Sequence, residues 1–325
     1  MTAATQIYAD ALVWDDHAGF ESRPDADLAQ LDHWQKAGVT YLSVNVGYDV
    51  RPWDNTVKTL AAFRRQIARE PDRFVLVERV ADVRRAKSEG KLAITFDIEG
   101  MESLDGEVDM VCAYYDLGVR HMLFAYNRNN RAGGGCQDED VGLTGFGRDV
   151  VQEMNRVGMV VDCSHSGYRT TMDAMEISSA PVVFSHSNPR ALCDHPRNIR
   201  DDQIKACAAT GGVIGINGIS LFLGDNDIRP ERFVDHVAYV AELVGAEHLG
   251  MGLDYFNEPD DLMETVARNQ TYWPASLGYD QSIEVMAPDT LPRITELLLE
   301  RGFSQSEVEG VLGENFLKVA ERVWK

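Results

Sequence analysis

Short runs of apolar, often β-branched residues recur along the chain and alternate with longer amphipathic segments. Residues 147–158 (GRDVVQEMNRVG) and 232–245 (RFVDHVAYVAELVG) show helical periodicity. Strands that alternate with helices predict a parallel sheet covered by helices on both faces. We therefore expect a ring of eight strands, with the run at 73–80 as an extra candidate. The eight predicted strands lie at 11–17, 40–46, 91–100, 119–127, 158–166, 180–187, 211–218 and 247–256.

Eight such units predict one (β/α)8 barrel of the TIM type, in the α/β class, that spans residues 1–325. No repeat, low-complexity tract or Pro/Gly/Ser linker divides the chain. An open, doubly wound sheet usually carries a phosphate-binding loop after its first strand, and neither GxGxxG nor GxxxxGK[ST] occurs here. The pattern therefore favours the closed barrel.

The composition limits which binding partners and which cellular location are expected for the protein. Hydrophobic residues make up 44% of the chain, which is enough for a large core. The formal net charge of -21 disfavours binding to nucleic acid or to an anionic membrane. The five cysteines form no CxxC pair, and the N-terminus MTAATQIYADALVWDD lacks the features of a signal peptide. We expect a cytoplasmic protein that acts on a small molecule.

Potential metal ligands lie where the predicted strands end, and in a barrel these ends meet on one face. A lone histidine is more often a structural residue than a ligand, but here the pattern recurs on several strands. His165, His186 and Glu99 would fill three positions of a tetrahedral Zn²⁺ and leave the fourth to water, whose pKa the metal lowers. Asp254 either transfers the proton or acts as an ordinary turn residue. The strand-end residues are His17, Asp97, Glu99, His165, His186 and Asp254.

The segment 185–202 (SHSNPRALCDHPRNIRDD) concentrates positive charge beside a ligand candidate. Because arginine binds carboxylates bidentately, it suggests a substrate with a free carboxylate. For Arg190 and Arg200 an ordinary surface loop is the simpler interpretation. Arg197 remains as a candidate for binding the substrate carboxylate. Tyr126 lies near the end of the fourth predicted strand and could reach the site.

With these residues identified, the chain resembles the membrane dipeptidase family, peptidase family M19, within the amidohydrolase superfamily. The resemblance covers most of the chain. It rests on stretches such as GKLAITFDIEGME, DLGVRHMLFAYNRNN, GLTGFGRDVVQEMNRVGMVVDCSHSG, APVVFSHSNPRALCDHPRNIRDDQIKA and HLGMGLDY.

The resemblance implies a distorted (β/α)8 barrel, a binuclear zinc site, hydrolysis of dipeptides and a homodimer. It assigns roles to seven positions of this sequence. His17 matches a ligand of one metal, Glu99 the bridging glutamate, His165 and His186 the ligands of the other metal, Asp254 the proton shuttle, Arg197 the partner of the substrate carboxylate, and Tyr126 a substrate-contacting position.

The sequence departs from the family pattern at two positions. The family's first strand reads His-x-Asp with the aspartate as a ligand, and here Gly19 stands in its place, so that Asp15 or Asp16 could substitute only imperfectly. Tyr126 replaces a histidine, and a phenol is uncharged at pH 7. We therefore expect one firmly bound ion, with the position beside His17 empty or weakly filled. Zn²⁺ is the first choice, although Mn²⁺ and Fe²⁺ accept the same ligands.

Three functions remain open at this point. The leading hypothesis is a metal-dependent hydrolase that cleaves a small peptide or amide with a free carboxylate. The second is a hydrolase of a non-peptide amide, imide or lactone in small-molecule catabolism. The third is a catalytically inactive homologue that binds metal, which the replacements at Gly19 and Tyr126 favour and the retention of Asp254 and Glu99 disfavours.

Overall fold

The computed structural model describes residues 2–256 and 259–325, without the side chains of residues 259–263. The strands are β1 (Trp14–Ala18), β2 (Tyr41–Tyr48), β3 (Phe74–Leu76), β4 (Leu92–Glu99), β5 (Val119–Leu123), β6 (Val160–Asp162), β7 (Val182–Val183), β8 (Ile214–Ile216) and β9 (Leu249–Met251). The α-helices are α1 (Ala3–Asp10), α2 (Leu31–Ala37), α3 (Trp53–Ile67), α4 (Val80–Glu89), α5 (Met110–Asp116), α6 (Gly145–Val157), α7 (Tyr168–Ile177), α8 (Asp201–Ala209), α9 (Ser220–Leu223), α10 (Pro230–Val244), α11 (Pro259–Arg268), α12 (Leu291–Glu300), α13 (Gln305–Glu309) and α14 (Asn315–Val323). Shorter helical turns are η1 (Met101–Leu104), η2 (Ala246–His248), η3 (Ala275–Leu277), η4 (Pro288–Thr290) and η5 (Gly310–Glu314).

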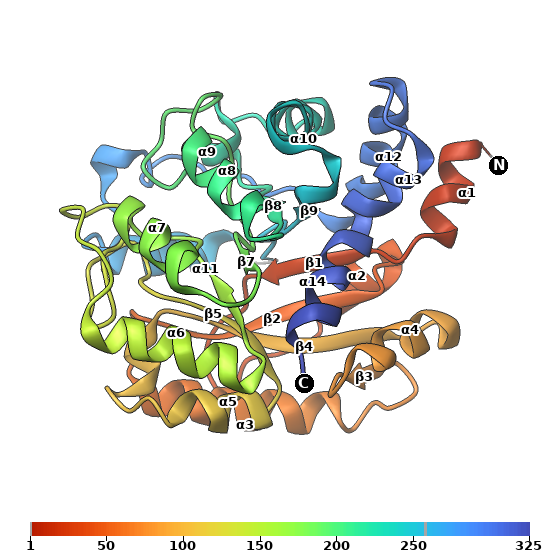
Figure 1. The fold of residues 1–325 in the computed structure, drawn as a ribbon. Helices are drawn as coiled ribbons and strands as arrows, with labels where there is room; N and C mark the ends of the chain where they lie inside the picture. The colour runs from red at the N-terminus through yellow and green to blue at the C-terminus, as the bar shows by residue number, and fades with distance from the viewer. Residues whose placement is uncertain (1, 257–258) are drawn as a thin grey trace.

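The strands form a parallel ring, which confirms the predicted α/β barrel (Figure 1). Six of them pair in the order β1-β2-β4-β5-β6-β7, and β8 pairs with β9. A bridge between Phe184 and Ile214 joins β7 to β8, and a bridge between Ala18 and Tyr255 joins β9 back to β1. The extra strand β3 pairs only with the first part of β4, while β5 pairs with the second part, so the barrel is distorted. The interpretation of residues 1–325 as one domain stays a prediction.

Apolar side chains close the barrel at the N-terminal ends of its strands. Trp14 at the start of β1 stacks on Tyr41 at the start of β2, with ring centroids 3.4 Å apart. Phe316 of α14 packs over Trp14 at 6.3 Å, and α14 lies across the strands in Figure 1. This end of the barrel is sealed, so access to the interior comes from the C-terminal ends of the strands.

Polar side chains fill the barrel between this seal and the opposite end. Alternate residues of a strand share a face, and β2 and β4 therefore direct Ser43, Asn45, Asp97 and Glu99 inward. The Ser43 hydroxyl donates a hydrogen bond to Asp97 at 2.7 Å, and Asn45 donates one at 3.0 Å. Buried polar groups are tolerated when they are paired in this way.

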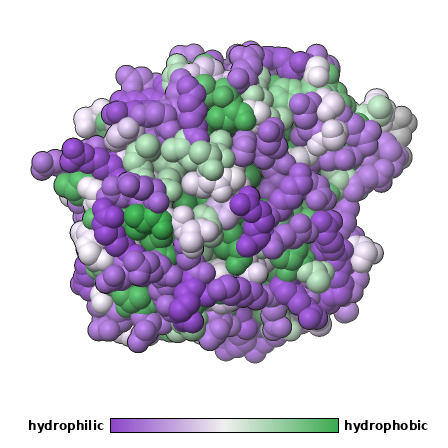
Figure 2. Space-filling model, viewed as in Figure 1, coloured by the Kyte–Doolittle hydropathy of each residue, from purple (hydrophilic) through white to green (hydrophobic). Residues whose placement is uncertain are grey.

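The outer surface agrees with the acidic composition. Figure 2 shows a face covered mostly by hydrophilic residues, interrupted by small hydrophobic areas. Among the described residues, we find no helix with the length and apolar character that a membrane crossing requires.

Close backbone approach at β8 makes the barrel sensitive to a single methyl group. A Cβ at Gly215 would lie 2.0 Å from the carbonyl oxygen of Ser185, whereas one at Gly145, at the start of α6, would meet nothing within 4 Å. We expect Gly215→Ala to lower the free energy of unfolding by about 1–3 kcal/mol or more, because the backbone between β7 and β8 must move. The matched change Gly145→Ala should leave it unchanged or raise it by up to about 1 kcal/mol. Urea unfolding of both variants checks this, and equal effects would contradict the close approach.

Candidate metal centre and active site

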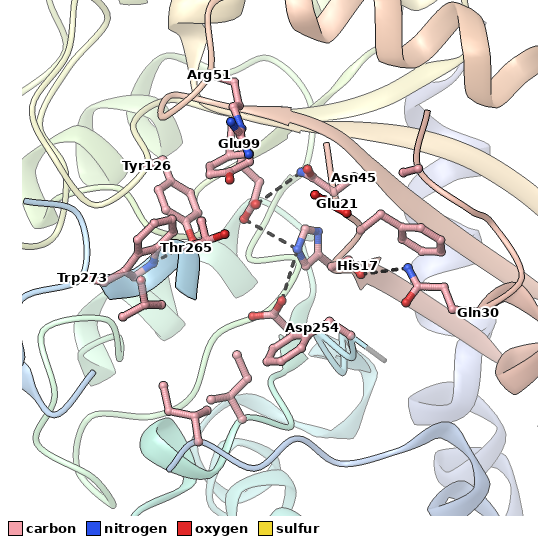
Figure 3. Close-up of a pocket in the computed structure, with 18 of the residues that line it drawn as sticks. His17, Glu21, Gln30, Asn45, Arg51, Glu99, Tyr126, Asp254, Thr265 and Trp273 are labelled. Atoms are coloured by element: carbon pink, nitrogen blue, oxygen red, sulfur yellow. Dashed lines mark hydrogen bonds and ion pairs between the residues drawn. The ribbon is translucent and has the colours of Figure 1, made fainter. Parts of the chain in front are cut away.

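The predicted strand-end residues meet at the open end of the barrel, as Figure 3 shows for His17, Glu99, Tyr126 and Asp254. His17 lies in β1, and Glu99 is the last residue of β4. The remaining candidates follow strands directly. Tyr126 comes after β5, His165 after β6, His186 after β7 and Asp254 after β9.

One carboxylate oxygen forms the centre of the cluster. Glu99 Oε1 lies 3.2 Å from His165 Nε2, 3.3 Å from His186 Nε2 and 3.6 Å from His17 Nε2. This oxygen is buried and has no hydrogen-bond partner among the described residues. His17, Glu99 and His186 each offer a ligand atom, and these atoms lie within 4.8 Å of one another. An unpaired carboxylate oxygen among imidazole nitrogens is a suitable donor set for a divalent cation.

The two histidines after β6 and β7 are held so that their Nε2 atoms face this centre. His186 Nδ1 donates to Ser185 Oγ at 2.6 Å, because that hydroxyl itself donates to Asp162 at 2.5 Å. His165 Nδ1 donates to Asn127 Oδ1 at 2.7 Å. Each ring therefore keeps its proton on Nδ1 and directs the Nε2 lone pair to the centre, where the two Nε2 atoms are 3.0 Å apart.

The pKa shifts of His165, His186 and Glu99 fit a site for a cation. Burial lowers the pKa of His165 and of His186 well below the usual value, and nearby positive charge adds to the effect. Burial also raises the pKa of Glu99 to about 8, although His17 opposes this shift. Two neutral imidazoles and a desolvated carboxylate together favour a bound cation, which the residues present can accept.

His17 differs from the other two histidines in its supporting partner. Its Nδ1 lies 3.2 Å from Asp97 Oδ1 and its Nε2 lies 3.5 Å from Asp254 Oδ1. Burial by itself lowers the pKa of His17, but Asp97 and Glu99 outweigh it and the pKa is raised well above 6.5. Asp97 thus orients His17 as Asn127 orients His165.

Asp254 is fixed beside the centre by its backbone and by one carboxylate oxygen. Its φ of 57° lies in the left-handed region, and its N–H donates to the His17 carbonyl at 3.1 Å. Asn217 donates to Asp254 Oδ2 at 3.0 Å, which leaves Oδ1 toward His17. His165 also has a positive φ, of 60°. Left-handed non-glycine residues cost energy and cluster at functional sites.

Tyr126 forms the wall beside His165. Its ring stacks on the His165 imidazole with centroids 4.3 Å apart, and its hydroxyl accepts a hydrogen bond from Trp273 Nε1 at 3.2 Å. Burial, with Glu99 and Asp254 nearby, raises the pKa of Tyr126 well above 10. The phenol is therefore neutral and can donate its own proton in a hydrogen bond.

A cavity of about 340 Å³ opens above the centre, and its lining includes His17, Glu99, Tyr126, His165 and Asp254. It also includes Arg51, whose Nε is buried without a hydrogen-bond partner among the described residues. A concave site with a few convergent polar groups is typical of small-molecule binding.

Arg197 lies behind this cavity. It lines a neighbouring cavity of about 180 Å³, which shares His165 with the larger one. Its side chain is buried and donates to Ser187 Oγ at 3.0 Å and to the His186 carbonyl at 2.7 Å. Its Nε has no partner within the described range. In this structure Arg197 supports the loop that carries His186.

The comparisons with known proteins agree with this geometry. The family model for membrane dipeptidases, peptidase family M19, matches residues 21–270. The chain belongs to this family. The structure of an amidohydrolase from Pseudomonas aeruginosa has a TM-score of 0.88 at 28% identity, and the match covers 99% of each chain.

Two curated relatives also match. An uncharacterized dipeptidase of Schizosaccharomyces pombe is 30% identical over 284 residues, which cover 83% of this chain and 62% of that protein. The dipeptidase tcpJ of Claviceps purpurea is 32% identical over 257 residues, which cover 78% of this chain and 56% of that protein. The chain thus spans less than two thirds of the length of these two relatives.

In this membrane dipeptidase family member, Gly19 has no side chain and so offers no ligand atom beside His17. Gly19 lies before the segment that the family model matches. Asp15 accepts a hydrogen bond from Trp34 Nε1 at 2.7 Å, and Asp16 accepts one from Trp14 Nε1 at 2.8 Å. Both neighbouring aspartates thus accept hydrogen bonds from groups outside the metal centre.

Several supporting residues of the site were not predicted from the sequence. Asn45, Asn127 and Asn217 were assigned no role, because their hydrogen-bond partners are far away in the chain. Arg51 follows β2 and was indistinguishable from a surface arginine. Asp97 could be predicted to lie near the site, because it is two residues before Glu99 in β4 and therefore shares its strand face.

The hydroxyl of Ser185 should control metal affinity through the ring orientation of His186. We expect Ser185→Ala to weaken Zn²⁺ binding by about 10–100-fold, since the Nδ1 partner is lost. Competition against a chromophoric chelator measures this. Ser88→Ala, on the exposed face of α4, is the matched control and should bind Zn²⁺ as the unmodified protein does. Equal affinities in both variants would contradict the orienting role.

Proposed function

We propose that this protein is a metal-dependent hydrolase of dipeptides or related small amides with a free carboxylate. The observation that carries the proposal is the convergence of three imidazole Nε2 atoms on the unpaired Oε1 of Glu99, beside Asp254, at the base of a cavity. Membership in the membrane dipeptidase family supports the same activity.

We assign His17, Glu99, His165 and His186 as the metal-holding residues. A divalent ion bound there, with Zn²⁺ as the first choice, supplies Lewis acidity toward water and the scissile carbonyl. The complete set is Glu99 with His165 and His186. The position beside His17 has a weakened ligand set, because Gly19 offers no side chain and both neighbouring aspartates are paired.

Asp254 is the proposed proton shuttle. Its Oδ1 is directed to the centre while Asn217 holds Oδ2, so one oxygen can accept a proton from the attacking water. The same oxygen can then donate that proton to the leaving amine. Tyr126 can donate a hydrogen bond to the carbonyl oxygen as its charge develops, with Trp273 fixing the position of the phenol.

Two arginines are candidates for the substrate carboxylate. The family resemblance assigns this role to Arg197, which would have to exchange its hydrogen bonds to Ser187 and His186 for the substrate. Arg51 lines the larger cavity and has an unpaired Nε among the described residues. We retain Arg197 and add Arg51. The homodimer and the cytoplasmic location stay predictions.

Replacement of the proton shuttle provides the central test. We expect Asp254→Asn to lower kcat for dipeptide hydrolysis by about 10²–10⁴-fold, because an amide cannot carry the proton. The metal content should stay the same. Asp109→Asn, at an exposed carboxylate before α5, is the matched control and should keep full activity. Activity that survives Asp254→Asn would rule out the shuttle.

The weakened second metal position can be tested by restoring its ligand. A Cβ at Gly19 would lie 3.4 Å from Phe256 Cβ, which is ordinary contact, so the backbone tolerates a side chain there. We expect about one tightly held ion per chain in the unmodified protein and about two in Gly19→Asp. Gly19→Ala, which adds bulk without a ligand, should still hold one. Mass spectrometry of metal content decides, and two ions in the unmodified protein would show that Gly19 does not weaken the site.

A substrate panel separates the other two hypotheses. Dipeptides, N-acyl amino acids and lactones should be tested with the metal-loaded protein. Hydrolysis of lactones or acyl amides alone would favour the non-peptide hydrolase. Metal binding without any hydrolysis would favour the inactive homologue.

A further inference from the structure

A separate hydrophobic cluster covers one side of the cavity. It is distinct from the two clusters that form the barrel core and its seal. Each of its buried members also lines the cavity above the metal centre. These members, which we term the apolar wall, are Ile219, Phe222, Val266, Trp273, Tyr279 and Ile283.

Each member of the apolar wall lines the cavity and keeps some exposed area. Its members are between 4% and 8% exposed, whereas many residues of the barrel core are at 0%. A residue packed on all sides has no exposed area, so the wall presents part of its surface to the cavity. Such a surface gains free energy when an apolar group covers it.

The segments that carry the apolar wall contact residues of the active site, Tyr126 and Asn127. The wall is made of two segments, 219–222 and 266–283. A backbone bridge between Ile219 and Val285, two residues after Ile283, links them. The amide of Asn127, which orients His165, donates to the Tyr272 carbonyl at 3.1 Å. Trp273 contacts Tyr126 at 5.8 Å between ring centroids. An apolar group held by the wall would therefore lie close to Tyr126 and to the support of His165.

Charged residues also line the cavity, Arg51 and Asp27 among them, but none belongs to the wall. Arg23 and Glu21 at the rim pair with each other at 2.7 Å, and both are about half exposed. Glu99 and Asp254 lie at the base. No member of the wall carries a charge, so the wall offers no ion-pair partner to a charged side chain, although the Arg197 guanidinium lies 5.6 Å from the centroid of the Phe222 ring.

We propose that the apolar wall is the side-chain subsite, and that the preferred substrates are dipeptides in which one residue is large and apolar, such as leucine or phenylalanine. This inference rests on the proposed function and names the substrate class. Wall contacts should discriminate against small side chains by about 10- to 200-fold, the range for one methylene group in a hydrophobic pocket.

The test compares kcat/KM of the metal-loaded protein for Ala-Ala, Ala-Leu, Leu-Ala, Ala-Phe and Phe-Ala, with Ala-Lys, Lys-Ala, Ala-Asp and Asp-Ala as charged counterparts. We expect at least one leucine or phenylalanine dipeptide to exceed Ala-Ala and all charged dipeptides by tenfold or more. Equal values, or a preference for charged side chains, would overturn this inference and leave the proposed hydrolase intact. Hydrolysis of none of them would overturn both.

A variant that fills the subsite links the preference to the wall. We expect Val266→Phe to lower the ratio of kcat/KM for the best large substrate to that for Ala-Ala by at least tenfold. Val141→Phe, at an exposed valine away from the cavity, should leave the ratio unchanged. If Val266→Phe fails to fold, Val266→Ala replaces it and should lower the ratio severalfold. An unaltered ratio in a folded wall variant would place the subsite elsewhere and overturn the inference.

Discussion

The burial of a carboxylate among imidazoles is the constraint on which this structure depends. Glu99 sits at the end of a strand, largely shielded from water, with its Oε1 facing His17, His165 and His186. A buried charge is costly unless it is paired or binds a metal. The surrounding barrel therefore has to hold each imidazole in one orientation, which it does through hydrogen bonds from the opposite ring nitrogen.

These outer hydrogen bonds explain the polar interior of the barrel. Asp97, Asp162 and Asn127 each act on a histidine, directly or through a hydroxyl, and are themselves held by neighbouring groups. The interior is thus organised in two layers, with an apolar seal at one end and a polar support for the site above it. The seal excludes water from below, and this raises the strength of every electrostatic contact in the centre.

Much of this arrangement could be predicted from the sequence. The eight strands and the extra strand at 73–80 were located correctly, because β-branched apolar runs in a parallel sheet are distinctive. The strand-end histidines and Glu99 were found by the same logic, since parallel strands bring their C-terminal ends together. Their chemical roles remain proposals.

Other features depended on tertiary contacts that periodicity does not record. The partner of His165 is Asn127, 38 residues away, and Arg51 shows its role only by its position in the cavity. The hydrogen bonds of Arg197 to Ser187 and to the His186 carbonyl also could not be predicted, and its role toward the substrate carboxylate stays a proposal. Residues 266–283 run from the end of α11 through loops and a short helical turn, so no periodic pattern predicted the packing of their aromatic and aliphatic side chains.

The apolar seal also has a consequence for folding during synthesis. Trp14 and Tyr41 leave the ribosome well before Phe316 of α14, which covers Trp14. Contacts between such distant parts of a chain form slowly and late. During synthesis β1 and β2 therefore wait with an uncovered aromatic surface until α14 emerges.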